Sequence, residues 1–561
     1  MKQSKLSSTW LTVFIAMVVA VSLWSCTDSD YDDLDSASEA VKGNAFIQLV
    51  INTSGTGTTR SSISTTEGTS SESNITDLKA VLTDGSTVKQ VIDFDIKSSS
   101  DSTQKVTEVE NVDAGIYYIY VLANYDACNL STISVGDAFD GDNAFTVSSY
   151  TGVSCPLANG DKFLMTNDSN AVGQTTLYKA TASNSTYLSN ELDSVGTVMT
   201  DGDTLVNVIE VNVERAVAKV TTSISGLDTN SSNFTITDAY GNEQVITKMD
   251  SVALTILNSQ AYLFRHQLDY SDEGVTTLAY DDLYYAEDPN FEFSDEALDS
   301  LESVSTWNSP FFVYEEADVK EAWQPSSSTQ YCLGNTMAAD YQRKGLSTCL
   351  IFQATIGDPV YTKLYTSDAS TTLNSYEKEY TETFLSIVNC SNDSIANTLF
   401  ETREDTDAEG TFYVYNNLLF ISEAAARMYK AIVTHQDEAS EATKLWGYYK
   451  ADATTFDCYE GGNMYYTHYI KHNTASDVDN EFGKYGVVRN HWYSITVTGV
   501  DGSSFGEPDP TPYTPGDDPD DPDDGDGDDP IDSSSSTKLQ VSVTINAWRN
   551  IVEDEVVLSN D

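Results

Sequence analysis

The stretch that decides the fold is the C-terminal one, TKLQVSVTINAWRNIVEDEVVL, residues 537–558. Apolar and polar residues alternate along its first half, which is the pattern of a β-strand with one apolar face. The apolar positions are Leu539, Val541, Val543, Ile545 and Ala547. Residues 507–536, which precede the strand, are rich in Pro, Asp, Gly and Ser and almost free of apolar side chains. A core strand on so long and polar a tether indicates a strand that is meant to pair with another molecule.

The composition predicts a β-rich globular protein of two or three domains. The chain has 561 residues, of which 40% are hydrophobic and 33 are tyrosines, and a chain of this length can bury sizeable cores. Its formal net charge of −58 repels nucleic acids and anionic lipid surfaces. We therefore expect no role in binding DNA, RNA or anionic membrane surfaces.

The first 25 residues have the pattern of an export signal. A positively charged start is followed by the apolar run of residues 10–21 and then by Cys26. Cleavage before Cys26 would leave this cysteine at the new N-terminus, as in bacterial lipoproteins. An ordinary signal peptide with an incidental cysteine, or an N-terminal membrane anchor, are the alternatives.

A second alternating strand lies near the N-terminus and is followed by a polar loop. Its inward-facing residues are Ala45, Ile47, Leu49 and Ile51. Residues 54–74 are small and polar, a composition that does not pack into a core. Arg60 is the one basic residue between Lys42 and Lys79. A lone arginine in such a loop is a good site for a trypsin-like protease, which would cut between Arg60 and Ser61.

Further strands are expected between these two. They include residues 77–82, 90–96, 115–124, 162–167, the long run 206–220, and residues 218–224, 233–237, 348–356, 448–471 and 487–500. The best helix is expected at residues 416–433. The number of short strands predicts two β-sandwich domains in tandem, with a boundary near residues 205–215.

Signatures of catalysis and of metal binding are absent from the sequence. Motifs of the HExxH, GxSxG, Walker A and GxGxxG types do not occur, so we expect neither an enzyme nor a cofactor. His468 and His472 have the spacing that binds zinc on a helix, but their surroundings favour a strand, where they would be half-exposed and too far apart for one metal. The acidic run 516–529 lacks the pattern of a calcium loop, so we interpret it as an extended linker. The six cysteines after Cys26 are expected to be buried thiols or one or two structural disulfides.

Several segments together resemble the fimbrillins of Bacteroidales, and most closely the major subunit of short fimbriae. The matching segments are GIYYIYVLAN at 115–124, KFLMTN at 162–167, VERAVAKV at 213–220, YEGGNMYYTHYIKHN at 459–473 and YGVVRNHWYSITVTGV at 485–500. An acidic linker and a last strand with Ala547 and Trp548 then close the chain.

This resemblance implies a mostly β protein with two tandem transthyretin-like β-sandwich domains and few short helices. The implied segments are a lipoprotein signal peptide (1–25), a propeptide with a removable first strand (26–60), an N-terminal domain (61–210), a C-terminal domain (211–506), the linker (507–536) and a donor strand (537–561). It also implies that Cys26 is lipidated, that Arg60 is the cut point of an arginine-specific protease, and that Leu539 to Ala547 replace the removed strand in a neighbouring subunit.

The resemblance implies a shaft subunit of a surface fimbrium that supports adhesion and biofilm formation, with its precursor held on the outer membrane by a lipid such as palmitate. Its partners would be other copies of itself, accessory fimbrial subunits and the protease. Five apolar side chains moving from water into a core are worth on the order of 8–15 kcal/mol before ordering costs. An anchor or tip subunit of the fimbrium and a glycan-binding surface lipoprotein are the alternatives.

Overall fold

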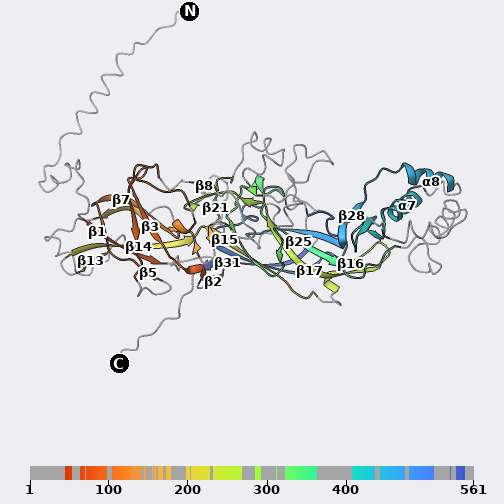
Figure 1. Ribbon diagram of the computed structural model, residues 1–561, viewed down its shortest axis with the longest axis horizontal. Helices are drawn as coiled ribbons and strands as arrows, with labels where there is room; N and C mark the ends of the chain where they lie inside the picture. Colours follow the sequence, from red (N-terminus) through yellow and green to blue (C-terminus); the bar gives the residue numbers. More distant parts are fainter. Residues whose placement is uncertain are drawn as a thin grey trace, which may run out of the picture.

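Figure 1 shows the computed structural model, an elongated molecule in which two β-rich lobes lie in line and helices cap one end. The structure describes residues 45–52, 64–69, 71–97, 104–128, 130–139, 144–146, 155, 157–159, 162–167, 172–177, 197–201, 204–227, 232–267, 285–291, 311–312, 322–362, 403, 407–435, 442–473, 479, 481–503, 505–510, 531 and 539–549. Within these ranges, no helix is long and apolar enough to cross a membrane.

The first lobe is one sheet that folds over on itself. Its strands are β1 (Ala45–Asn52), β3 (Leu78–Thr83), β4 (Val88–Phe94), β5 (Gln104–Val106), β6 (Glu110–Val112), β7 (Gly115–Ala123), β11 (Met165–Asn167), β12 (Val172–Leu177), β13 (Thr197–Asp201) and β14 (Thr204–Arg215). The order is β4-β3-β7-β11-β14-β1-β5, with β12, β13 and β6 beside β7, β14 and β1. The fold-over lies in β14, because its residues 204–212 pair with β1 and β13 whereas 213–215 pair with β11. The two halves enclose the first core.

The second lobe is a sandwich of two sheets. One has the order β2-β31-β30-β15-β24, built from β2 (Ser64–Glu67), β15 (Val217–Ile224), β24 (Thr329–Leu333), β30 (His491–Val500) and β31 (Leu539–Arg549). The other has the order β16-β17-β25-β29 with β23 on β17, built from β16 (Thr235–Thr237), β17 (Glu243–Thr255), β23 (Gln324–Pro325), β25 (Cys349–Ile356) and β29 (Asn463–Tyr469). Inward side chains such as Val220, Phe352 and Ile495 form the second core between them.

A helical cap closes the far end of the second lobe (Figure 1). It consists of β26 (Phe412–Tyr415), β27 (Leu418–Phe420), β28 (Asp457–Tyr459), α7 (Glu423–Thr434) and α8 (Ala442–Ala451). The helix predicted at 416–433 starts later, because Asn416 and Asn417 adopt φ of 50° and 56° and turn the chain into a hairpin. Ser422 then caps α7, its side chain accepting a hydrogen bond from the Ala425 amide at 3.2 Å.

Short paired strands and single helical turns complete the described structure. The strands are β8 (Ala144–Thr146), β9 (Ala158–Asn159), β10 (Lys162–Phe163), β18 (Leu257–Asn258), β19 (Gln260–Tyr262), β20 (His266–Gln267), β21 (Ala286–Glu287) and β22 (Phe311–Phe312). The turns are η1 (Ser71–Ser73), η2 (Asp126–Cys128), η4 (Ser232–Phe234), η6 (Ala339–Tyr341) and η8 (Glu460–Gly462). The pair β8–β19 ties the two lobes together.

The predicted fold class, mostly β with tandem sandwiches, is confirmed. The long run 206–220 is a pair of strands, β14 and β15, on either side of Ala216. The buried side chain of Val217 belongs to the first core and that of Ala218 to the second. The lobes therefore meet at these residues.

Candidate functional site

Strand β1 lies inside the first lobe, with one face fully buried. Ala45, Ile47, Leu49 and Ile51 are all 0% exposed and belong to the first core. The strand pairs in parallel with β14 over six residues and antiparallel with β5 and β6 on its other side. Because β1 has partners on both edges, its removal would leave two unpaired strand edges and an apolar groove between them.

The other face of β1 is held by polar contacts. The side chain of Gln48 donates to the Thr107 carbonyl at 2.8 Å. The Asn52 amide donates to Glu210 Oε1 at 2.6 Å and to Asn212 Oδ1 at 3.2 Å. These contacts fix the register of β1 against its neighbours, since each amide has its partner at only one position along the ladder.

Strand β31 has the same alternation but a shallower position. It pairs with β30 from Leu539 opposite Val500 to Ala547 opposite His491. Leu539 is 7% exposed, and Val541, Val543 and Ile545 are half-buried against the second core, while the alternate residues Gln540, Ser542 and Thr544 are exposed. The side chain of Ala547 lies outside the described residues. In this structure the predicted donor strand therefore rests, partly covered, on the sheet of its own chain.

The outer edge of β31 is covered at one end by β2. The four residues Ser64–Glu67 pair in parallel with residues 546–549. Residues 53–63, between β1 and β2, include the predicted cut point at Arg60 and Ser61 and lie outside the described residues, as does Cys26. The predicted cut thus falls between a strand of the first lobe and a strand of the second.

A buried ion pair anchors the chain just after β2. The carboxylate of Glu72, which is 3% exposed, lies 2.8 Å from the Lys219 ammonium and accepts a hydrogen bond from the Tyr331 hydroxyl at 2.6 Å. Arg215 donates to the Glu72 carbonyl at 3.0 Å. Burial alone would raise the pKa of Glu72, but the hydrogen bonds from Lys219 and Tyr331 outweigh it and hold the pKa below its usual value. This anchor does not depend on the integrity of the loop at Arg60.

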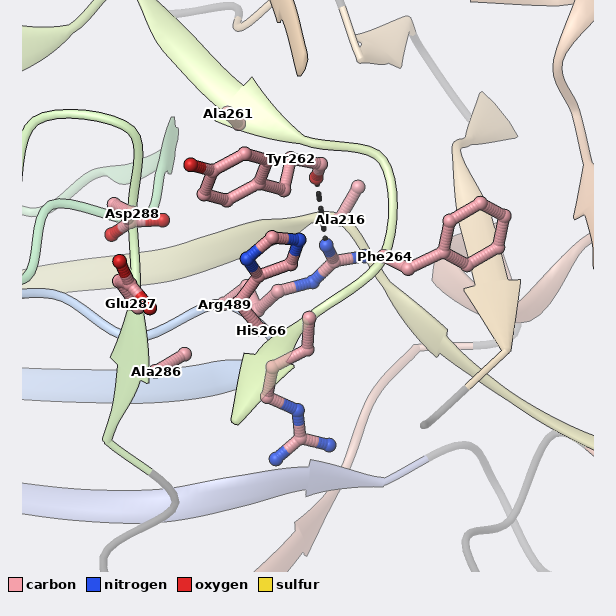
Figure 2. A pocket seen from close by; sticks show the side chains of 11 residues that line it. Ala216, Ala261, Tyr262, Phe264, His266, Ala286, Glu287, Asp288 and Arg489 are labelled. Atoms are coloured by element: carbon pink, nitrogen blue, oxygen red, sulfur yellow. Dashed lines mark hydrogen bonds between the residues drawn. The ribbon is translucent and has the colours of Figure 1, made fainter. Parts of the chain in front are cut away.

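The hollow at the junction of the lobes is occupied by structural contacts (Figure 2). Arg489 donates to the carbonyls of Tyr262 and Leu263 at 3.1 and 3.2 Å and to the Thr166 hydroxyl at 3.0 Å. Its Nε lies 3.1 Å from Glu214 Oε1. One side chain of the second lobe thus binds both the end of β19 with the residue after it and strand β11 of the first lobe, so the two lobes are held as one unit.

The segments that resemble fimbrillins contain asparagines with a structural role. Asn124 and Asn490 adopt φ of 60° and 58°, a conformation that asparagine tolerates better than most residues. Asn124 donates to the carbonyls of Asn74 and Phe163. The side-chain oxygen of Asn167 in β11 accepts a hydrogen bond from the backbone amide of Val121 in β7 at 2.7 Å, in the place of a backbone carbonyl. These motifs are structural.

His468 and His472 are buried, which corrects the half-exposed positions expected for them. They are 4% and 1% exposed. His468 lies on the inward face of β29, and neither of its ring nitrogens has a hydrogen-bond partner among the described residues. His472 Nδ1 lies 2.7 Å from the Tyr493 hydroxyl. Burial lowers the pKa of His468 to about 4, with Lys471 contributing, and that of His491 to about 3, with His472 contributing. Within the described residues no cluster of three or more potential metal ligands occurs.

Among the linker residues that the structure describes, Ile531 is an anchor point that the composition does not indicate. Ile531 is 2% exposed and packs in a small core with Phe311, Tyr469 and Tyr485. Its amide donates to the Gln342 carbonyl at 3.2 Å. The tether between the second lobe and β31 is therefore attached along its course. The described cysteines at positions 128, 332, 349 and 458 are free thiols.

The comparison with protein families gives one match. Residues 457–554 match the family described as major fimbrial subunit protein type IV, fimbrillin, C-terminal. The matched residues include β29, β30, the linker and β31. The fimbrillin resemblance expected from the sequence is confirmed by this match, which covers the predicted donor strand. No curated protein matches the chain.

Three solved structures are similar to this chain at low sequence identity. A fimbrilin from Porphyromonas gingivalis is 12% identical, with 91% of this chain and 99% of that chain covered and a TM-score of 0.39. The tip fimbrial protein of Porphyromonas gingivalis is 8% identical, with 90% and 100% covered and a TM-score of 0.30. A fimbrial assembly protein from Parabacteroides distasonis is 12% identical, with 56% and 82% covered and a TM-score of 0.27.

Proposed function

From the premise that residues 457–554 belong to the fimbrillin family, we propose that the chain is a structural shaft subunit of a cell-surface fimbrium. It polymerises after a protease cuts at Arg60 and frees β1. The C-terminal strand β31 of another copy then fills the groove that β1 leaves. The fimbrium serves adhesion and biofilm formation, and the precursor reaches the outer membrane as a lipoprotein through Cys26.

The observation that supports this proposal most is the difference in depth between two similar strands. The inward side chains of β1 are 0% exposed, whereas Val541, Val543 and Ile545 of β31 are only half-buried in their own sheet, where their strand segment pairs with β30 alone. A strand segment that is paired on one side and moves to a position with partners on both sides gains apolar burial and a second ladder of hydrogen bonds. The exchange therefore has a driving force.

The positions of the two strands favour a filament. The groove of β1 lies in the first lobe and β31 in the second (Figure 1). A contact between two different surfaces of identical subunits does not close on itself, so it propagates from copy to copy. The contacts of Arg489 and of Glu72 keep the lobes together, which would make each subunit a rigid segment of the filament.

The proposal is tested with purified precursor lacking its signal segment. Treatment with an arginine-specific protease should yield a ladder of oligomers on gels run without boiling, and fibres in electron micrographs. The matched control is Arg60→Ala, which keeps both strands and should remain monomeric. A chain that is cut after Arg60, as verified by mass spectrometry, and still stays monomeric would contradict the proposal.

A further inference from the structure

We propose that the strand of the second copy enters the groove in the direction opposite to β1, with Ala547 in the place of Ala45. This inference rests on the proposed strand exchange. It concerns which way β31 runs in the groove and which side chain fills each position. Alternation alone does not decide this, because both directions turn the same apolar face inward.

The size of the residue at the first groove position decides between the directions. Ala45 is 0% exposed and lies in the first core. If β31 ran in the direction of β1 over the whole groove, Leu539 would occupy the position of Ala45 and bring three additional carbon atoms into a filled site. Overpacking of this kind typically weakens a state by roughly 5- to 150-fold in its equilibrium constant.

The opposite direction avoids that overpacking. Ala547 then takes the place of Ala45, and Ile545 takes the place of Ile47, both without a change of side chain. Val543 and Val541 take the places of Leu49 and Ile51, which removes one methyl group at each position. If β31 ran in the direction of β1, one methyl group would likewise be lost at each of the positions of Ile47 and Leu49. The number of lost methyl groups is therefore the same in both directions, and the two directions differ only at the site of Ala45.

Shifts of two residues in the direction of β1 fit less well. One shift places Ala547 in the site of Ile51 and opens a cavity there. The other brings Thr537 into the site of Ala45, where a hydroxyl would be buried. Neither shift places a small side chain in the site of Ala45 and large side chains in the sites of Ile47, Leu49 and Ile51 without burying a hydroxyl.

The polar face and the ladder are compatible with the opposite direction. Gln540 would take the place of Asn52, whose amide donates to Glu210 and Asn212, and a glutamine supplies the same amide one carbon further out. The six-residue ladder with β14, now parallel, would become antiparallel, and antiparallel pairing is slightly more stable per residue. The shorter ladders with β5 and β6 would become parallel in exchange.

Disulfide trapping between two different molecules tests the direction. Asn212, which lies opposite Asn52, is replaced by Cys in the accepting subunit, and Gln540→Cys or Asn546→Cys is introduced in the donating subunit. Both are cut with the arginine-specific protease, mixed and oxidised mildly. We expect a cross-linked dimer with Gln540→Cys and none with Asn546→Cys. Each variant oxidised alone is the control for disulfides through the natural cysteines.

A size series gives an independent readout. Ala547→Leu should slow or weaken polymerisation by roughly 5- to 150-fold, whereas Leu539→Ala should leave the fit in the groove unchanged because Leu539 lies beyond its end. Cross-linking through Asn546, or faster assembly of Leu539→Ala with normal assembly of Ala547→Leu, would overturn the inferred direction. Polymers that form but cross-link through neither pair would overturn the register. Absence of polymers from the cut, unsubstituted chain would instead overturn the proposed function.

Discussion

Truncating the two similar strands should have opposite consequences before and after assembly. Leu49→Ala removes a side chain that is 0% exposed, and such truncations cost about 2–5 kcal/mol in folding free energy. Val543→Ala removes two methyl groups worth about 0.8 kcal/mol each when fully buried. Because Val543 is half-buried in the uncut chain, its truncation should cost about half of that sum. In the uncut chain, Leu49→Ala should therefore be the more damaging change by about 1–4 kcal/mol.

In the polymer the order reverses. Residue 49 has been removed with β1, so Leu49→Ala should have no effect on the heat or denaturant needed to dissociate fibres. Val543 now lies in the groove, so Val543→Ala should lower fibre stability by the full loss of about 1.5 kcal/mol, plus a cavity cost, at every subunit contact. Ser542→Ala, on the exposed face of the same strand, is the matched control.

The assays are guanidinium unfolding of the uncut variants and dissociation of their fibres on denaturing gels over a temperature series. A Leu49→Ala chain whose fibres are less stable than those of the unsubstituted chain would refute the reasoning, since it would mean that β1 remains in the polymer. A Val543→Ala chain with unchanged fibres would equally refute it.

Three further predictions concern groups outside the groove. The pKa of His468 is lowered from 6.5 to about 4, so the stability that its neutral form contributes is complete above pH 6.5 and is lost as the pH falls toward 4. In His468→Leu, the unfolding free energy that is lost between pH 6.5 and pH 4 should be smaller by up to about 3 kcal/mol, as measured by thermal unfolding over this pH range. An unchanged pH profile would contradict the role of His468. Glu72→Ala leaves Lys219 buried without its carboxylate partner and should lower the unfolding free energy by about 3–5 kcal/mol in denaturant unfolding. A decrease below about 1 kcal/mol would contradict the role of Glu72 as an anchor. Ile531→Ser should free the tether and speed hydrogen exchange in residues 539–545 of the uncut chain, with exchange at β1 as the internal control; equal exchange in β31 would show that Ile531 does not hold it.

The two strands at the ends of the chain were predictable because a period of two is a local signal. Both β1 and β31 lie where alternation of apolar and polar residues indicated them. Alternation shows which face turns inward but not how deep a strand lies. The pairing of β1 on both edges, and that of residues 541–545 of β31 on one edge only, involve strands far away in the sequence, so the difference in burial between β1 and β31 emerged only from the structure.

Other features of the structure were not predicted from the sequence, for reasons that the residues show. The helix expected from residue 416 contains a hairpin turn, which the pair Asn416–Asn417 could have indicated because asparagine adopts positive φ. The half-exposed position predicted for His468 is wrong, because its alternation with Met464 and Tyr466 places it on the buried face of β29. The burial of Ile531 has no local signal, since one apolar residue in an acidic linker carries no period. The anchor at Glu72 likewise depends on Lys219 and Tyr331, which are distant in the chain.

The departure of β1 from the subunit, and its replacement by β31 of another copy, can be tested directly in assembled material. The measurement is mass spectrometry of the subunits in fibres purified from the cell surface. We predict chains that begin at Ser61, retain residues 539–549 and lack residues 45–52. Assembled subunits that still contain residues 45–52 would contradict the exchange of strands.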